Sequence, residues 1–264
     1  MNIKMIATDL DGTLLHGNDG FNTSVSDYTL SVLKKCRAKG IKITYATARD
    51  AGAPVPALAE MVDGYVQNNG AKAYIGDTLV YKRAIPIESV RDLLIAADNA
   101  GVKITAEQDG TFYGNFSNRE GWVWQWPSSH ENIDFNTLDI EANFLVAIAN
   151  SPEESKTAEQ VIKKYLPDDL NLLILEKGVL LVVLHKDAIK SKGVAALAAH
   201  WGIEPSEIAA FGDATIDIDL LEYCGAGVAV SNAIDEVKNV ADYICESNDN
   251  DGVAKWIEKY ILID

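Results

Sequence analysis

Short apolar runs alternate with stretches of helical spacing in the first and last thirds of this 264-residue chain. The runs are apolar on both faces, as in parallel strands that helices cover on both sides. The predicted strands are residues 3–7, 41–46, 64–67, 208–211 and 226–230, and the predicted helices are 25–39, 52–62, 190–201, 217–223, 234–240 and 252–261. This alternation predicts a doubly wound, Rossmann-like α/β core with a parallel sheet.

The middle of the chain, from residue 84 to residue 184, has a different pattern. After a first helix the predicted elements are strands 102–105, 111–115 and 143–149, a helix at 152–165, and strands 172–175 and 179–184. The last two strands are separated by Glu176-Lys177-Gly178, which favours an antiparallel hairpin. We therefore expect an inserted α+β domain at residues 83–186, with residues 1–82 and 187–264 forming one core domain.

The chain carries 39 acidic and 23 basic side chains, a formal net charge of −16. Such a surface argues against nucleic acid and against anionic membranes as partners. The three cysteines are too few and too scattered for a disulfide framework, and no stretch approaches the ~20 apolar residues of a membrane span. With no targeting segment recognised at the N-terminus, we expect a cytoplasmic protein. The sequence carries no signal for oligomeric state.

Polar residues follow each predicted core strand, where ligands bind in open α/β sheets. In strand order these residues are Asp9 and Asp11; Thr47 and Arg49; Asn68 and Asn69; Asp213 and Asp217; and Ser231 and Asn232. Because the carboxyl ends of parallel strands meet at one edge, we expect a shared site there.

Asp9 and Asp11, two residues apart in extended chain, can face the same way. With Asp213 and Asp217 they would place up to four carboxylates in one crevice, which requires a cation. Hard oxygen ligands in this number suit Mg²⁺. A carboxylate can also attack phosphorus to form an aspartyl-phosphate, while a second one transfers protons.

Asp9-Leu10-Asp11-Gly12-Thr13-Leu14-Leu15 closely resembles the first signature of the haloacid dehalogenase-like hydrolases. Thr47 resembles the second signature, Lys192 before Gly193 the third, and Gly212-Asp213 through Asp217 the fourth. The stretch from Asn232-Ala233 to Asp251-Gly252-Val253-Ala254 resembles the C-terminal part of the Cof-type branch, and the insert resembles that branch's type-two α/β cap. The resemblance covers the whole chain.

The resemblance implies a role for each matching residue. Asp9 would be the nucleophile and Asp11 the general acid and base, with Thr47 and Lys192 binding the transferring phosphoryl group. Asp9, the backbone carbonyl of Asp11 and Asp213 would bind Mg²⁺, and Asp217 would ligate it through water or hold Lys192. Two plainer interpretations stay open: Thr47 could cap a following helix, and Lys190 is a close rival of Lys192.

Arg49, Asn69 and Asn232 are candidates for the substrate entrance, although each could be an ordinary loop residue. Two positions depart from the family pattern: Ala48 stands where glycine is common, and Ile216 where asparagine is common. In the inserted domain, Trp122, Trp124 and Trp126 could form an aromatic platform or simply pack. The segment Ser247 to Gly252 superficially resembles a calcium loop, but a helix-capping loop is the better interpretation.

These observations predict a Mg²⁺-dependent phosphatase that acts on small phosphorylated metabolites, with sugar phosphates as the expected substrates. A phosphotransferase or phosphomutase would use the same residues, with an acceptor other than water. A third alternative is a phosphometabolite-binding protein that has lost turnover, for which Ile216 is the only support.

Overall fold

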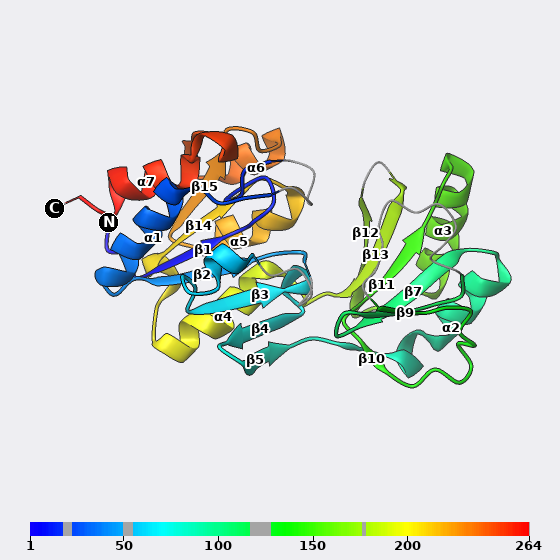
Figure 1. Ribbon diagram of the computed structural model, residues 1–264. Helices are drawn as coiled ribbons and strands as arrows, with labels where there is room; N and C mark the ends of the chain where they lie inside the picture. Colours follow the sequence, from blue (N-terminus) through cyan, green and yellow to red (C-terminus); the bar gives the residue numbers. More distant parts are fainter. Residues whose placement is uncertain (18–22, 50–54, 117–127, 176–177, 264) are drawn as a thin grey trace. The chain divides into compact units, whose positions relative to one another are not determined.

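The chain divides into two compact units (Figure 1). The computed structural model describes residues 1–17, 23–49, 55–116, 128–175 and 178–263. The inserted unit begins at Arg83, and the core unit resumes at Ile189 rather than at residue 187. Trp122, Trp124 and Trp126 lie outside the described residues.

An eight-stranded sheet forms the centre of the core unit, in the order β16-β15-β14-β1-β2-β3-β4-β5. The strands are β1 (Met5–Thr8), β2 (Lys42–Ala46), β3 (Gly64–Gln67), β4 (Lys72–Ile75), β5 (Thr78–Lys82), β14 (Ile208–Gly212), β15 (Ala226–Val230) and β16 (Tyr243–Cys245). The pairings from β16 to β3 are parallel, whereas β4 and β5 add an antiparallel hairpin that the apolar pattern did not predict.

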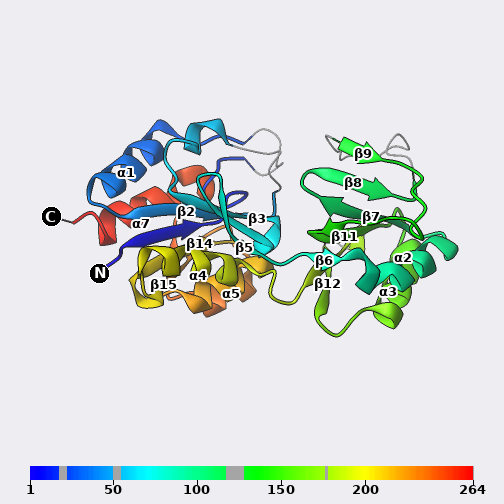
Figure 2. The same ribbon diagram turned by 90° about the horizontal axis from the view of Figure 1, so that it is seen from below.

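Helices cover both faces of this sheet. Figure 2 shows α1 and α7 on one face and α4 and α5 on the other. The core helices are α1 (Asp27–Ala38), α4 (Lys190–Trp201), α5 (Ile218–Tyr223), α6 (Asp235–Val240) and α7 (Gly252–Tyr260). Met5, Ile6 and Ala7 of β1 are completely buried, as strands covered on both sides must be. The predicted doubly wound α/β core is therefore confirmed.

The predicted helix at residues 52–62 is wrong where the structure describes it. Residues 55–62 contain a short 3₁₀ turn, Pro56–Leu58, in its place. Pro56 disfavours the helical conformation of Val55, which is extended with φ −95° and ψ 100°. The other 3₁₀ turns of the core are Asn68–Gly70, Pro205–Glu207, Thr215–Asp217 and Asn248–Asn250.

The inserted unit is a six-stranded sheet, β12-β13-β11-β7-β8-β9, with helices α2 (Ile87–Asn99) and α3 (Pro152–Tyr165). Its strands are β7 (Lys103–Gln108), β8 (Thr111–Gly114), β9 (Ser128–His130), β11 (Phe144–Ile148), β12 (Leu170–Leu175) and β13 (Leu180–His185), and β6 (Ile85–Pro86) pairs with β10 (Glu141–Ala142). The antiparallel pairing of β12 with β13 matches the predicted hairpin. The two helices pack on one face through residues such as Leu93, Leu94 and Ile162.

Among the described residues, none of the helices combines the length and apolar character needed to cross a membrane.

Candidate active site

The register of the core sheet brings three strand ends together. Thr8, the last residue of β1, pairs with Phe211 of β14 and with Tyr45 of β2. The N–H of Asp9 continues the ladder and donates to the carbonyl of Phe211 at 2.9 Å. Asp9 therefore lies at the same edge of the sheet as the residues that follow β14 and β2.

A buried lysine lies between two of the predicted carboxylates. Nζ of Lys190 is 2.6 Å from Oδ1 of Asp9 and 2.6 Å from Oδ1 of Asp217. The side chains of Lys190 and Asp217 are fully buried, and that of Asp9 is 8% exposed. Charged groups so deeply buried are tolerated only when they are paired and hydrogen-bonded, as these are.

The structure corrects the choice between the two lysines. Lys190 is the first residue of α4, and its ammonium group reaches the carboxylates. Lys192 is exposed. Two residues of an α-helix differ by about 200° around its axis, so the two side chains cannot face the same site. The structure therefore places Lys190, and not Lys192, beside the carboxylate cluster.

Burial dominates the electrostatics of the cluster. It raises the pKa of Asp9 to about 8, against the lowering effect of Lys190 and with further raising by Asp217 and Asp213. Burial also raises the pKa of Asp213 to about 6. For Lys190, burial would lower the pKa, but the charges of Asp217 and Asp9 outweigh it and raise the pKa above its usual value. The cluster thus holds a charged lysine and more carboxylates than this lysine can neutralise.

Both carboxylate oxygens of Asp217 are engaged within the protein. Oδ1 accepts from Lys190, and Oδ2 accepts from the backbone N–H groups of Asp213 at 3.1 Å and Ala214 at 3.0 Å. Asp217 therefore holds Lys190 and shapes the loop that carries Asp213, whereas the sequence analysis expected it to hold Lys192 or to ligate the metal through water.

Asp213 is held by the loop that follows β1. Oγ1 of Thr13 donates to Oδ1 of Asp213 at 2.7 Å, a contact that the sequence analysis missed. Gly12 has φ +79°, and a Cβ there would come within 2.7 Å of Oδ2 of Asp213. Glycine at this position thus permits both the left-handed backbone and the close approach of the carboxylate.

One group of possible metal ligands lies in the part of the chain that the structure describes. Oxygens of Asp9, Asp213 and Asp217 lie within 4.8 Å of one another. A set made of carboxylate oxygens suits a hard divalent cation such as Mg²⁺. The donor chemistry therefore fits the metal that the sequence predicts.

Arg49 holds Asp11 with a bidentate ion pair. Its Nε donates to Oδ2 of Asp11 at 2.7 Å, and its Nη2 donates to Oδ1 of the same carboxylate. Nη2 also donates to Oγ1 of Thr23, at 3.1 Å. The hydrogen bond to Asp11 raises the pKa of Arg49. Arg49 thus lies directly beside the predicted general acid, and Thr23 is a neighbour that the sequence analysis did not identify.

Thr47 and Asn69 are joined by the backbone of their loops. Thr47 is buried, and its Oγ1 accepts from the N–H of Arg49 at 3.1 Å. The N–H of Asn69 donates to the carbonyl of Thr47 at 3.1 Å. The structure therefore brings Thr47, Arg49 and Asn69 together.

Asn232 braces two loops through its side-chain amide. Its Nδ2 donates to the carbonyl of Gly12 at 2.7 Å, and its Oδ1 accepts from the N–H of Asn248 at 3.1 Å. Because both ends of the amide bind backbone, the side chain links the loop after β1 to residues 246–251, which we call the C-terminal loop.

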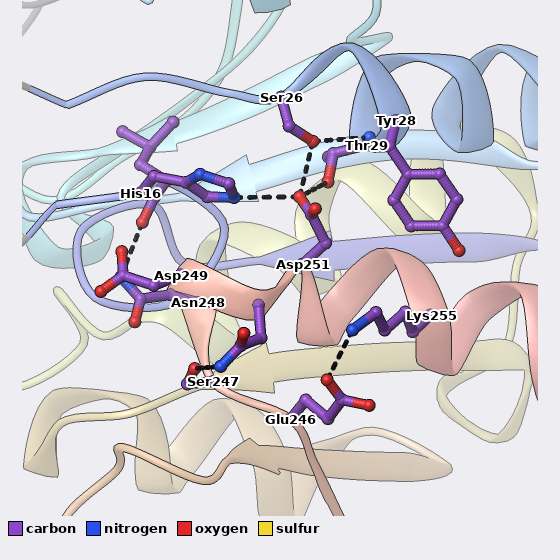
Figure 3. Close-up of polar contacts among 12 residues, drawn as sticks. His16, Ser26, Tyr28, Thr29, Glu246, Ser247, Asn248, Asp249, Asp251 and Lys255 are labelled. Atoms are coloured by element: carbon purple, nitrogen blue, oxygen red, sulfur yellow. Dashed lines mark hydrogen bonds and ion pairs between the residues drawn. The ribbon is translucent and has the colours of Figure 1, made fainter.

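The C-terminal loop makes hydrogen bonds to residues that follow the first signature (Figure 3). Oδ1 of Asp251 accepts from Nε2 of His16 at 2.9 Å, from Oγ of Ser26 at 2.5 Å and from Oγ1 of Thr29 at 2.9 Å. Asp249 accepts instead from the N–H of Gly17 at 2.9 Å. The two carboxylates thus serve donors on other segments, and Asp251, the N-cap residue of α7, makes no side-chain hydrogen bond to that helix. Ser26 was recognisable as a helix N-cap from its residue type alone.

Comparison with known proteins places this site in a family. A family model described as haloacid dehalogenase-like hydrolase matches residues 6–257. The phosphoglycolate phosphatase of Sulfolobus acidocaldarius is 25% identical over 259 residues, covering 98% of this chain and 97% of that protein. The 5-amino-6-(5-phospho-D-ribitylamino)uracil phosphatase YitU of Bacillus subtilis is 24% identical over 272 residues, with 98% of each chain covered.

A solved structure, the subclass IIB sugar phosphatase BT4131, has a TM-score of 0.78 at 25% identity, covering 98% of this chain and 100% of that one. The chain belongs to the haloacid dehalogenase-like hydrolases, as the signatures predicted. The family and these relatives identify it as a phosphatase. The binding protein without turnover that Ile216 suggested is not supported.

Proposed function

We propose that this phosphatase hydrolyses small phosphorylated metabolites, with sugar phosphates as its substrates, through an aspartyl-phosphate on Asp9. The observation that carries the proposal is the buried contact between Lys190 and Asp9, with Asp213 beside them. The likeness to a sugar phosphatase supports the substrate class.

The family resemblance, together with the contacts of these side chains, supports a role for each group. The second oxygen of Asp9 attacks phosphorus while the bond from phosphorus to the substrate oxygen breaks, and Asp11 donates a proton to that leaving oxygen. Asp11 then removes a proton from the water that attacks the aspartyl-phosphate, which releases phosphate and restores Asp9. Lys190 and Thr47 bind the phosphoryl oxygens, where positioning and charge stabilisation provide most of the catalysis.

Arg49 sets the condition for the first proton transfer. Both oxygens of Asp11 accept hydrogen bonds from Arg49. Protonation of Asp11 weakens these bonds, because a neutral carboxyl group is a poorer acceptor than a carboxylate. The Arg49 guanidinium then turns in part toward the substrate.

Mg²⁺ would be held by Asp9, Asp213 and the backbone carbonyl of Asp11, with Asp217 fixing Lys190 and the adjacent loop. When bound, the metal neutralises negative charge on the carboxylates and the phosphoryl group.

The test measures phosphate release from a panel of phosphomonoesters with Mg²⁺ for the wild type, Asp9→Asn and Asp235→Asn. Asp235 is exposed and serves as a matched control for loss of one carboxylate. We expect release by the wild type and the control, and none by Asp9→Asn. Borohydride reduction followed by mass spectrometry should mark Asp9. Activity in Asp9→Asn, or a mark elsewhere, would refute the assignment; a new phosphomonoester formed with a sugar acceptor would indicate transfer instead of hydrolysis.

A further inference from the structure

Three consecutive residues after β3 have left-handed backbone. The values of φ are 53° for Asn68, 56° for Asn69 and 105° for Gly70. Such a conformation is unfavourable for most side chains and persists where the surrounding structure imposes it. The Oδ1 atoms of both asparagines are buried and find no hydrogen-bond partner among the described residues. Asparagine therefore contributes its tolerance of this backbone rather than a bond from its amide oxygen.

On one side the turn holds the loop of the second signature. The N–H of Asn68 donates to the carbonyl of Arg49 at 3.0 Å, and the N–H of Asn69 donates to the carbonyl of Thr47 at 3.1 Å. Consecutive N–H groups point to one loop here because both residues share one helical, left-handed conformation. The backbone positions of Thr47 and Arg49 thus depend on this turn.

On its other side the turn packs against the start of α4. A Cβ on Gly70 would lie 2.2 Å from the carbonyl carbon and oxygen of Ile189 and 2.6 Å from its nitrogen. Ile189 is the N-cap residue of α4, and its carbonyl accepts from the N–H groups of Lys192 at 3.2 Å and Gly193 at 3.4 Å. Since these atoms are backbone, no side-chain rotation can relieve such an overlap. The residue that follows Ile189 is Lys190.

We propose that the Asn68–Gly70 turn is a positioning device shared by two parts of the active site. It sets the Thr47–Arg49 loop through two backbone hydrogen bonds, and it sets the first turn of α4 through direct backbone packing. The spacing between these two parts determines whether Arg49 faces Asp11 while Lys190 faces Asp9. The catalytic consequence rests on the proposed function, whereas the positions of the two parts can be measured in a crystal structure without any turnover.

The first test compares Gly70→Ala with Gly40→Ala and Gly76→Ala. Gly40 and Gly76 also have positive φ, +79° and +56°, but a Cβ at either position meets nothing within 4 Å. All three variants carry the strain of alanine in left-handed backbone, and Gly70→Ala alone displaces Ile189. We expect kcat to fall about 100-fold for Gly70→Ala, the cost of a misplacement of about 1 Å, and the controls to keep their kcat.

A crystal structure of Gly70→Ala provides a readout that does not need turnover. Nζ of Lys190 should lie beyond hydrogen-bond distance from Asp9, with the sheet unchanged. Lys190 in its original place, or an equal loss of kcat in the controls, would overturn the proposal. If the wild type releases no phosphate from any substrate, the proposed function fails, and the structure of the variant still decides the positioning.

Should Gly70→Ala not fold, Asn68→Gly and Asn68→Val provide the second test. Glycine accepts left-handed backbone and valine resists it, while both remove the amide. We expect Asn68→Gly to keep wild-type kinetics and Asn68→Val to raise KM about tenfold through displacement of the Thr47–Arg49 loop. Equal losses in the two variants would show that the side chain matters, which contradicts the proposal.

Discussion

The ammonium group of Lys190 lies 2.6 Å from a carboxylate oxygen of Asp9, and the lysine side chain has no exposure to solvent. The pair is formed by residues 181 positions apart in the chain. It joins the first turn of α4 to the end of β1, and it places a fixed positive charge beside the nucleophile of the proposed reaction.

This contact predicts different outcomes for two neighbouring lysines. Lys190→Met should reduce phosphate release at least about 100-fold, because a preorganised charge at the phosphoryl group is lost. Lys192→Met, at an exposed position of the same helix, should keep nearly full activity. Steady-state kinetics compares the two, and circular dichroism establishes that both are folded. A larger loss for Lys192→Met would return the role to that residue.

The half-buried carboxylate of Asp213 predicts a pH-dependent stability in protein without metal. Because burial raises its pKa to about 6, the folded state keeps a proton that the unfolded state loses above about pH 4. The stability contributed by Asp213 therefore falls as pH rises through this window. Asp213→Asn does not titrate. The difference between its free energy of unfolding and that of the wild type should therefore shift in favour of the variant by about 1–2 kcal/mol from about pH 4 to about pH 7, after allowance for solvent screening.

Urea denaturation in the presence of a chelator measures this difference at each pH. Asp235→Asn, an exposed carboxylate, should show no such gain. A constant gap between Asp213→Asn and the wild type would contradict the raised pKa.

Metal binding should stabilise the folded protein through the same carboxylates. Mg²⁺ at about 100 times its dissociation constant should raise the free energy of unfolding by about 2.7 kcal/mol. Asp213→Asn should lose most of this gain, whereas Asp235→Asn should keep it. Thermal denaturation with and without Mg²⁺ measures the effect, and a chelator should abolish phosphate release by the wild type. Full stabilisation of Asp213→Asn would place the metal elsewhere.

The C-terminal loop predicts a stability difference between two nearby aspartates. Burial alone would raise the pKa of Asp251, but hydrogen bonds from Ser26, Thr29 and His16 outweigh it and lower the pKa. Asp251→Asn should therefore cost about 1 kcal/mol at neutral pH, since hydrogen bonds to a charged acceptor are the stronger ones. Asp249→Asn, which affects one exposed backbone donor, should cost less.

The cost of Asp251→Asn should also depend on pH in a defined direction. A carboxylate with a lowered pKa stabilises the fold above its unfolded pKa of about 3.9 and loses this effect as pH falls through the folded value. The gap between Asp251→Asn and the wild type should thus close in acid. A gap that persists in acid would mean that the substitution acts through packing instead of charge.

Much of the fold was predictable because strands buried on both faces leave a clear apolar pattern. The segment around Val55 was misjudged, since the apolar spacing outweighed Pro56 in the prediction. The hairpin of β4 and β5 was missed; its strands include the polar or charged residues Lys72, Thr78 and Lys82. Local pattern thus identified the parallel strands from β15 to β3, but it overlooked the parallel edge strand β16 as well as the antiparallel hairpin.

The chain order was enough to predict that Asp9, Asp213 and Asp217 lie together, because they follow strands whose carboxyl ends must share an edge. Which lysine joins them depends on the packed fold, since Lys190 and Lys192 have similar local surroundings and differ in direction around α4. That direction depends on where Ile189 begins the helix, against the backbone of Gly70. Asn232 and Asp217 show the same limit. Their residue types allow a ligand contact, but the packed structure assigns their oxygens and nitrogen to other groups of the protein, because hydrogen-bond partners are set by three-dimensional contacts.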